Sequence, residues 1–511
     1  MAEVYKGPMI QDQIAGGTIT LLETSPDMEQ PLINSALTDD LKASPLKLKN
    51  DELNFYSLRQ TGIAAVEETV VFNSPPPHIN KDIDRTKLTK VRLEQQRLKQ
   101  LLGISKMGEI SALINDPEER ARRTERAYKL LAGSYDIKGE TEEETTEKVK
   151  ATIAEIGILV DSTIDDATKD FPPPLVEQGQ DSVIRKIHNP VDLALAMFDN
   201  SLEPLDRFRA KRKLVLMGLG GSVDLREREV KTDEAYQKFN TFLEEYVLNP
   251  RSDEDKKEKY LLSTHDPETF ATNSVTLISK EEKDAMMLEP GQKLTRIQRR
   301  TFTVSTPKGP KEIGMHIAVT TGGVQFDADA NEQETSEDNP ITRRKKKRRM
   351  ILKLLRKGHE NPALAVDDQI GVMTVFNNKH DLRLFREHLS ISATQAGCLL
   401  GFEETEDTLN GGVHNAASEG SSKNLQWFKT FLKMDGMRPE FIGHTLETIP
   451  DYLYKRGLSH PEYSNQRFIE SGVMELLFPP DKHLYNYNPA KVKAYAMSKV
   501  RQKIEDPNVI M

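Results

Sequence analysis

Residues 366–376 read Val-Asp-Asp-Gln-Ile-Gly-Val-Met-Thr-Val-Phe, and this stretch does most to decide the fold. Its second part, 370–376, is a short apolar run rich in β-branched residues, which predicts a buried strand. Two carboxylates, Asp367 and Asp368, come just before that strand, and Gly371 lies close behind them. A carboxylate at the mouth of a strand can hold Mg²⁺, so the segment predicts a strand with a candidate metal ligand at its entry.

Strand and helix patterns continue on both sides of this segment. Upstream, two runs of β-branched and aromatic residues, 299–305 and 313–320, are joined by a Pro-Lys-Gly-Pro turn and predict a β-hairpin. Downstream, the pattern predicts a helix over 379–389 and then strands over 397–402, 424–434 and 440–446. This mixture predicts one α/β (α+β) domain with a mixed sheet over about 295–490, followed by a helix or tail over 491–511.

The N-terminal half of the chain has a different character. Residues 1–84 carry scattered apolar groups without a sustained period, which predicts a weakly ordered segment. Helical periodicity predicts two helical regions, 85–170 and 175–290, separated by the break at Phe171-Pro-Pro-Pro174. In the second region, Gly218-Leu-Gly-Gly221 follows a helical pattern and lacks the lysine of a phosphate-binding loop. We therefore expect these glycines to cap or break a helix.

Composition excludes several classes of protein. The chain has 511 residues with 71 Lys and Arg against 80 Asp and Glu, and the net charge of −9 argues against a general nucleic-acid coat. No apolar run approaches the roughly 18–20 residues of a membrane-spanning helix, and the N-terminus does not resemble a secretory signal. Cys398 is the only cysteine, so no internal disulfide can form. We expect a soluble, cytoplasmic protein.

Charge is unevenly distributed just before the quoted stretch. Six of the twelve residues at 327–338 are acidic, whereas ten of the fifteen at 343–357 are Lys or Arg. If the basic segment is a helix, cations recur at every fourth position along one face, and the apolar face could rest on a sheet. The stripe consists of Lys345, Arg349, Lys353 and Lys357. Fixed cations suit a polyphosphate, but a solvated basic face or a nucleic-acid contact would look the same.

A second carboxylate lies on a predicted strand further along the chain. The period of two along a strand places Glu440, Ile442 and His444 on one face. If this strand adjoins the one that begins at 370, Glu440 lies near the acidic entry of that strand and could serve as a second metal ligand or a general base. An ordinary carboxylate at a strand end is the plainer interpretation.

With these segments in order, residues 340–480 resemble the RelA/SpoT-type nucleotidyltransferase domain of alarmone synthetases. That family has a basic Arg-x-Lys…Lys helix, an Asp-x-x-Gly strand entry and a late Glu-x-Gln-x-Arg strand. The basic helix corresponds here to Arg343, Lys345 and Lys353. The two strand motifs correspond to Asp368-Gln-Ile-Gly371 and to Glu440-Phe-Ile-Gly-His444, in which Ile and His stand where the family has Gln and Arg.

The resemblance implies a Mg²⁺-dependent transferase that moves pyrophosphate or a nucleotidyl group from ATP to a nucleotide or to a ribose 3′-hydroxyl. Asp368 would bind the metal, and Glu440 would share the metal or activate the hydroxyl. Trp427 or Phe428 would replace the tyrosine on which the base stacks. The cations that would hold the ATP phosphates are Arg343, Lys345, Lys353 and Lys357.

Two other interpretations remain open. The same fold could be a non-catalytic binding protein that uses its basic helix to contact RNA or another acidic partner. Alternatively, the protein could be a scaffold whose helical N-terminal half carries the function. The acidic segment at 327–338 could fold over the basic helix and compete with phosphate for its cations, which is a prediction from charge alone.

Overall fold

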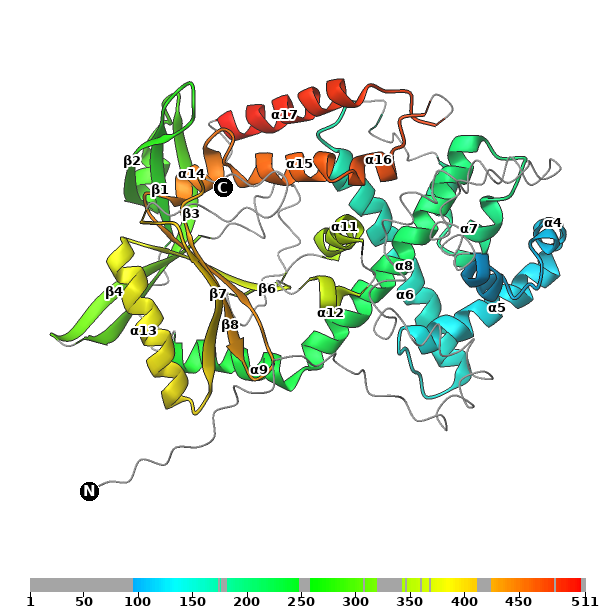
Figure 1. Ribbon diagram of the computed structural model, residues 1–511, viewed down its shortest axis with the longest axis horizontal. Helices are drawn as coiled ribbons and strands as arrows, with labels where there is room; N and C mark the ends of the chain where they lie inside the picture. Colours follow the sequence, from blue (N-terminus) through cyan, green and yellow to red (C-terminus); the bar gives the residue numbers. More distant parts are fainter. Residues whose placement is uncertain are drawn as a thin grey trace, which may run out of the picture.

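The structure is a computed structural model, which shows a helical part and a sheet joined by the C-terminal helices (Figure 1). It describes residues 95–172, 175, 182–247, 258–306, 308–318, 342–344, 347–358, 361–366, 369–410, 424–481 and 484–506. The predictions for 1–84, the acidic segment 327–338, Lys345 and Asp368 lie outside these residues. No helix in the described ranges is long and apolar enough to cross a membrane.

The helical part is formed mainly by the region that helical periodicity identified. Its longest members, α6 and α8, pack against each other. Its elements are η2 (Met107–Glu109), α4 (Ile110–Asn115), α5 (Pro117–Ser134), α6 (Glu142–Thr168), η4 (Val183–Lys186), α7 (Pro190–Ala196) and α8 (Pro204–Thr232). The next two elements, α9 (Glu234–Thr241) and η5 (Phe242–Val247), are buried in the core of the sheet instead. The prediction of helices over 85–170 is confirmed for its described residues.

Helix α8 runs without a break through the glycines at 218–221, so the expectation of a cap or break there was wrong. The glycines instead allow close packing between helices. A Cβ placed on Gly221 would lie 2.1 Å from Cζ of Tyr135, and one on Gly220 would lie 2.8 Å from Cγ2 of Ile156. Neither distance is compatible with a side chain, so the small residues are required where α8 contacts its neighbours.

One nine-stranded sheet forms the other part of the molecule. Its order is β2-β1-β3-β4-β6-β9-β8-β7, with β5 paired to β6. Strands β6 and β9 are parallel, and the other pairs are antiparallel. The strands are β1 (Glu258–His265), β2 (Thr272–Ser279), β3 (Gln292–Thr306), β4 (Gly309–Ala318), β5 (Thr342–Arg344), β6 (Ile370–Phe376), β7 (Leu400–Asp407), β8 (Phe428–Met434) and β9 (Glu440–Thr445).

The mixed sheet in the C-terminal half is confirmed, and β6 has the predicted bounds 370–376. The hairpin predicted from 299–305 and 313–320 is β3 and β4, and β3 begins earlier, at Gln292. The prediction of helices throughout 175–290 was wrong at its end, because β1 and β2 form a second hairpin there. The run Val275-Thr-Leu-Ile-Ser279 carries the β-branched signal that should have identified the latter strand.

Helices cover both faces of the sheet around β6 and β9. Helix α13 (Lys379–Gln395) packs on one face, where Phe376, Phe385 and Phe441 share a buried cluster. Helix α14 (Ile449–Tyr454) packs on the opposite face against Met373, Val375 and neighbouring residues. The remaining helices are α10 (Lys280–Ala285), α12 (Pro362–Ala365), α15 (His460–Glu470), α16 (Val473–Leu477) and α17 (Pro489–Glu505). The helix predicted at 491–511 corresponds to α17.

The basic segment forms α11 (Lys347–Lys357), and its apolar face does not rest on the sheet. That face is buried in the same cluster as residues of α6, α8 and α16, and Figure 1 shows α11 beside α8. It consists of Met350, Ile351, Leu354 and Leu355. The domain boundaries expected in chain order therefore do not match the cores, because α11 and the C-terminal helices complete the core of the N-terminal helices.

Candidate functional site

The site predicted at the start of β6 is assembled by strand register. Gly371 on β6 is paired with Arg343 on β5 and with Glu440 on β9. Neighbouring strands lie about 4.8 Å apart, and residues in register share one face of the sheet. The sheet therefore brings together three positions that are separated by as many as 97 residues in the chain (440 − 343).

Arg343 was expected within the basic helix, and the structure places it in the short strand β5 instead. The helix begins only at Lys347. The physical reason lies in the sequence, because the seven consecutive cations at 343–349 contain no apolar residue that could bury against a neighbour. The first buried side chains are Met350 and Ile351, and helical structure extends just one turn ahead of them.

Glu440 is paired with a lysine that the sequence did not single out. Lys429, on β8, places Nζ 2.6 Å from Oε1 of Glu440, and the two side chains are 26% and 18% exposed. The register of β8 against β9 puts Lys429 opposite Ile442, which shares a face with Glu440. The carboxylate therefore points along the sheet toward β8, where Lys429 neutralises it.

Aromatic rings lie on both sides of that lysine. Lys429 Nζ is 5.6 Å from the ring centre of Trp427 and 5.5 Å from that of Phe431, both within cation–π range. Trp427 is half-buried, and its ring centre lies 6.5 Å from that of Tyr452 on α14. The structure thus brings Trp427 next to the Glu440 pair through Lys429, and it packs the indole against the apolar cluster under α14.

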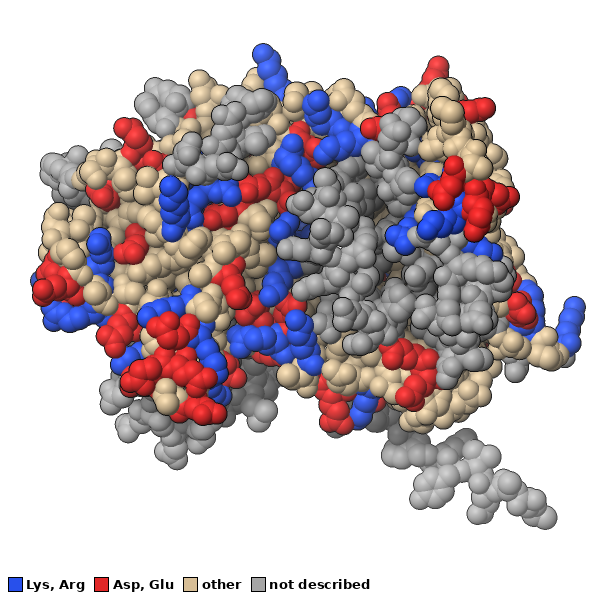
Figure 2. Space-filling view, turned by 180° about the vertical axis from the view of Figure 1, so that it is seen from behind, with Lys and Arg blue, Asp and Glu red and all other residues tan. Residues whose placement is uncertain are grey.

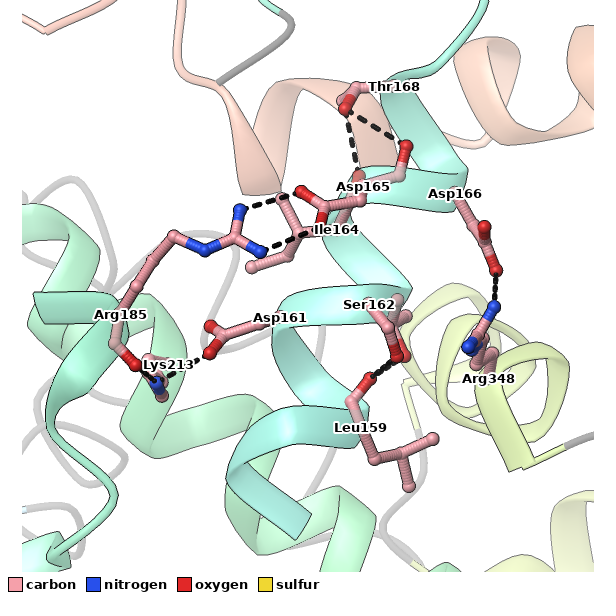
Figure 3. A network of polar contacts seen from close by, with 11 residues as sticks. Leu159, Asp161, Ser162, Ile164, Asp165, Asp166, Thr168, Arg185, Lys213 and Arg348 are labelled. Carbon is pink, nitrogen blue, oxygen red and sulfur yellow. Dashed lines mark hydrogen bonds and ion pairs between the residues drawn. The ribbon is translucent and has the colours of Figure 1, made fainter. Parts of the chain in front are cut away.

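The first turn of α11 is held by acidic residues of the helical part. Lys347 Nζ lies 2.8 Å from Asp224 and 2.9 Å from Glu227, both on α8. Arg348 forms an ion pair with Asp166 on α6 (Figure 3). Burial lowers the pKa of Lys347, but its hydrogen bonds to Asp224 and Glu227 outweigh that effect and raise it above the usual value. These two cations are therefore engaged within the protein.

Two further cations that the sequence singled out lie in the second half of α11 and differ in their exposure. Lys353 is half-buried and Lys357 is exposed, in the second half of α11. Along the chain, only the short helix α12 lies between the basic helix α11 and the strand β6 that bears Gly371, among the elements described. Lys345 and Asp368 lie outside the described residues, and their roles stay predictions.

Glu440 is the described carboxylate nearest to the start of β6 in strand register. Mg²⁺ in phosphoryl-transfer sites is usually held by one or two carboxylates together with phosphate oxygens of the substrate. Glu440 supplies one such carboxylate, at present engaged by Lys429. Within the described ranges no group of three or more His, Cys, Asp or Glu side chains could hold a metal ion. Glu440 alone would therefore need further oxygen ligands to hold a metal ion.

The partners of Glu440 and of α11 were missed by the sequence reasoning. Lys429 lies two residues after Trp427 on a predicted strand, so its face could have been inferred, but the sheet order that puts β8 next to β9 could not. Asp224 and Glu227 are three residues apart on a helix, a spacing that places both on one side. Comparisons of the chain with models of protein families, with curated proteins and with solved structures gave no match.

Proposed function

We propose that this chain is a magnesium-dependent nucleotide pyrophosphokinase or nucleotidyltransferase of the RelA/SpoT-like type. The observation that carries the proposal is the row of Arg343, Gly371 and Glu440 on the adjacent strands β5, β6 and β9. Arg343 comes from the basic segment, Gly371 follows Asp368 at the start of β6, and Glu440 is the carboxylate at the start of β9. Three motifs that resemble the family separately in sequence are thereby neighbours in space.

The reaction would be the attack of an acceptor hydroxyl on a phosphorus atom of ATP. Attack on the β-phosphorus forms a new P–O bond, breaks the bond to the α-phosphate oxygen and releases AMP; attack on the α-phosphorus releases pyrophosphate. Glu440 would accept the proton of the hydroxyl or help to hold Mg²⁺, which neutralises phosphate charge when bound. Lys353, Lys357 and Arg343 would contribute positive charge toward the phosphates.

Gly371 fits this proposal because it leaves the face beside Glu440 without a side chain. A Cβ at Gly371 would meet only the carbonyl oxygen of Glu440, at an ordinary 3.6 Å. The glycine is therefore not demanded by packing in the described protein, and a close approach of substrate supplies a reason for it. A Gly371→Val variant should fold and should bind nucleotide more weakly.

A non-catalytic binding protein is the second candidate, and the Lys429–Glu440 pair favours it, because a lysine neutralises the expected metal ligand. Contact with RNA across the sheet is less well supported. The cations on β8 and after it, Lys429, Lys433 and Arg438, are each paired with carboxylates of β7 or β9. Basic and acidic side chains are also interspersed on the face shown in Figure 2. RNA binding would therefore depend on α11.

The test is a transfer assay on the full chain. ATP labelled in its α-phosphate and, in a parallel reaction, in its β-phosphate is incubated with Mg²⁺, the protein and a panel of nucleotides and tRNA. Label on the acceptor is measured, because a transferred nucleotidyl group carries the α label and a transferred pyrophosphate group carries the β label. We expect Glu440→Gln to lower the rate by about 10²-fold or more, the usual contribution of a general base. Glu312→Gln, the same change at an exposed position on β4, is the matched control and should keep full activity.

The outcome separates the two candidates. If wild-type protein transfers no label to any acceptor but binds RNA, and if Lys353→Ala and Lys357→Ala weaken that binding and reduce its salt dependence, the binding candidate replaces the transferase. If transfer occurs and Glu440→Gln leaves its rate unchanged, the site assignment is wrong although the activity is right.

A further inference from the structure

Among the residues that the structure describes, strand β2 forms an open edge of the sheet. It is the terminal strand in the sheet order, where it pairs with β1, and Figure 1 shows it at the outer limit of the sheet. The ten residues 270–279 contain no charge and no proline, in a chain in which 30% of residues are charged. Proteins commonly protect such edges with charges, prolines or bulges. In β2 the one irregularity lies at its start, beside Thr272 and His265.

The hydrogen-bonding pattern shows which backbone groups of β2 face outward. The N–H of His265 donates to the carbonyl of Gly291 on the β3 side, at 2.9 Å. Because antiparallel strands alternate, the residues of β1 one position out of phase point toward β2. Their register partners there are Ser274, Thr276 and Ile278. Val275 and Leu277 consequently direct their N–H and C=O groups away from β1, toward the open edge.

Apolar side chains flank the edge on both faces of the sheet. Val275 and Leu277 are half-buried on the face that α14 covers. On the other face, Ile278 packs with partly buried Met286 and Leu288. Between these two residues of the loop, Met287 is 92% exposed. An additional strand on β2 would therefore gain backbone hydrogen bonds and would also cover apolar surface.

We propose that two copies of this chain associate through β2, antiparallel to each other about a twofold axis at Thr276. This register pairs Val275 with Leu277 of the partner subunit, and both are residues with outward-facing backbone groups. It places these two apolar side chains across from each other on both sides of the axis, a favourable cross-strand pair. The nine-stranded sheet would continue through the interface.

Charge favours a second copy over a different partner. When β2 pairs with the β2 strand of a second copy, both strands carry the same residues. A charged residue in that strand would then readily lie close to the same charge on the other copy. The uncharged segment 270–279 avoids this conflict in every register. A different protein or peptide is commonly selected by complementary charges, and residues 270–279 offer none for that purpose.

The test measures the mass of the full chain in solution by sedimentation equilibrium over a range of concentrations. Wild-type protein should be a dimer. Thr276→Lys places two lysines against each other at the axis and should weaken association at least tenfold. Thr303→Lys makes the same change at an exposed position of β3, away from β2, and should leave the dimer intact. Equal circular dichroism spectra and a cooperative melting transition in each establish that both variants fold.

Hydrogen exchange at the amides of Val275 and Leu277 completes the experiment. Both amides should exchange slowly in the dimer and quickly in Thr276→Lys. A wild-type monomer with fast exchange overturns the proposal. Slow exchange in a monomer would also overturn it, because a segment of the same chain would then occupy the edge. A dimer that withstands Thr276→Lys with unchanged exchange would place the interface elsewhere.

Discussion

The helical part and the sheet each contain a lysine that is almost completely buried, and they compensate its charge differently. Lys213 on α8 is 2% exposed, and its Nζ lies 2.8 Å from a carboxylate oxygen of Asp161 on α6. Lys293 on β3 is 1% exposed, and its Nζ donates to the backbone carbonyl of Asp506 at the end of α17. The ring of Tyr454 lies 5.8 Å from the same Nζ.

The two buried lysines connect different pairs of elements and differ in the groups that oppose the effect of burial on their pKa values. Burial lowers the pKa of Lys213, and the hydrogen bond to Asp161 acts against that effect. Burial lowers the pKa of Lys293 to about 8, and only the charges of Asp506 and Glu505 oppose it. In the helical part, an ion pair joins α6 to α8. In the sheet, Lys293 donates a hydrogen bond to the end of α17, and its lowered pKa means that it releases its proton near pH 8.

The largest effect is expected from breaking the buried pair of the helical part. Lys213→Met leaves Asp161 in the core without its cation, and removal of one member of a buried pair costs about 3–5 kcal/mol of unfolding free energy. Lys238→Met removes a lysine whose partner Glu234 is 83% exposed, and should cost about 0.5 kcal/mol or less. Urea denaturation measures both. Similar losses of unfolding free energy in the two variants would contradict the view that the buried pair of Lys213 contributes more than the exposed pair of Lys238.

The next effect is a pH dependence of the unfolding free energy, to which the lysine of the sheet should contribute more than Lys213. An unfolded lysine keeps its proton up to about pH 10.5, whereas folded Lys293 releases it near pH 8. Between these values the unfolded state binds more protons, so the unfolding free energy should rise with pH, by up to about 3 kcal/mol. Lys293→Met should lack this rise. Denaturation curves from pH 7 to 10.5 give the difference, and parallel pH profiles would refute the assignment.

Much of the sheet could be predicted because local patterns determine it. The β-branched run at 370–376 became β6, and the turn predicted at 307–310 is near the point where β3 ends, at Thr306, and β4 begins, at Gly309. The hairpin of β1 and β2 was missed because its first strand begins in a charged segment that continues a helical pattern. Helix α11 was recognised as amphipathic, but its partner was not, since the cluster that buries Leu354 also contains residues from 137 to 223 and from 473 to 496.

The candidate site was predictable in its residue types and only partly in its contacts. That Glu440 would adjoin the strand containing Gly371 followed from the order of the motifs, and the register confirms that these two positions are neighbours. The pairing of Glu440 with Lys429 could not be predicted, because it depends on β8 lying beside β9. The neutralisation of Lys347 by Asp224 and Glu227 depends equally on how α11 docks on α8.

The smallest effect is expected for an exposed ion pair of α6. Figure 3 shows three acidic side chains of this helix with different partners. Asp166 pairs with Arg348 at 31% and 29% exposure, whereas Asp161 pairs with Lys213 at 13% and 3%. A double-mutant cycle with Asp166→Asn and Arg348→Gln should give a coupling of about 0.5–1 kcal/mol that declines in 1 M salt, since exposed pairs are screened.

The same cycle with Asp161→Asn and Lys213→Met should give a larger coupling that persists in 1 M salt, because ions cannot approach a buried pair. Equal salt dependence in the two cycles would mean that water and ions reach Lys213, and would contradict the burial of its pair with Asp161. A salt-sensitive Asp166 pair has a functional consequence too: Arg348 could be drawn from α6 by a polyphosphate on α11, so bound nucleotide should reduce that coupling and leave the Asp161 coupling unchanged.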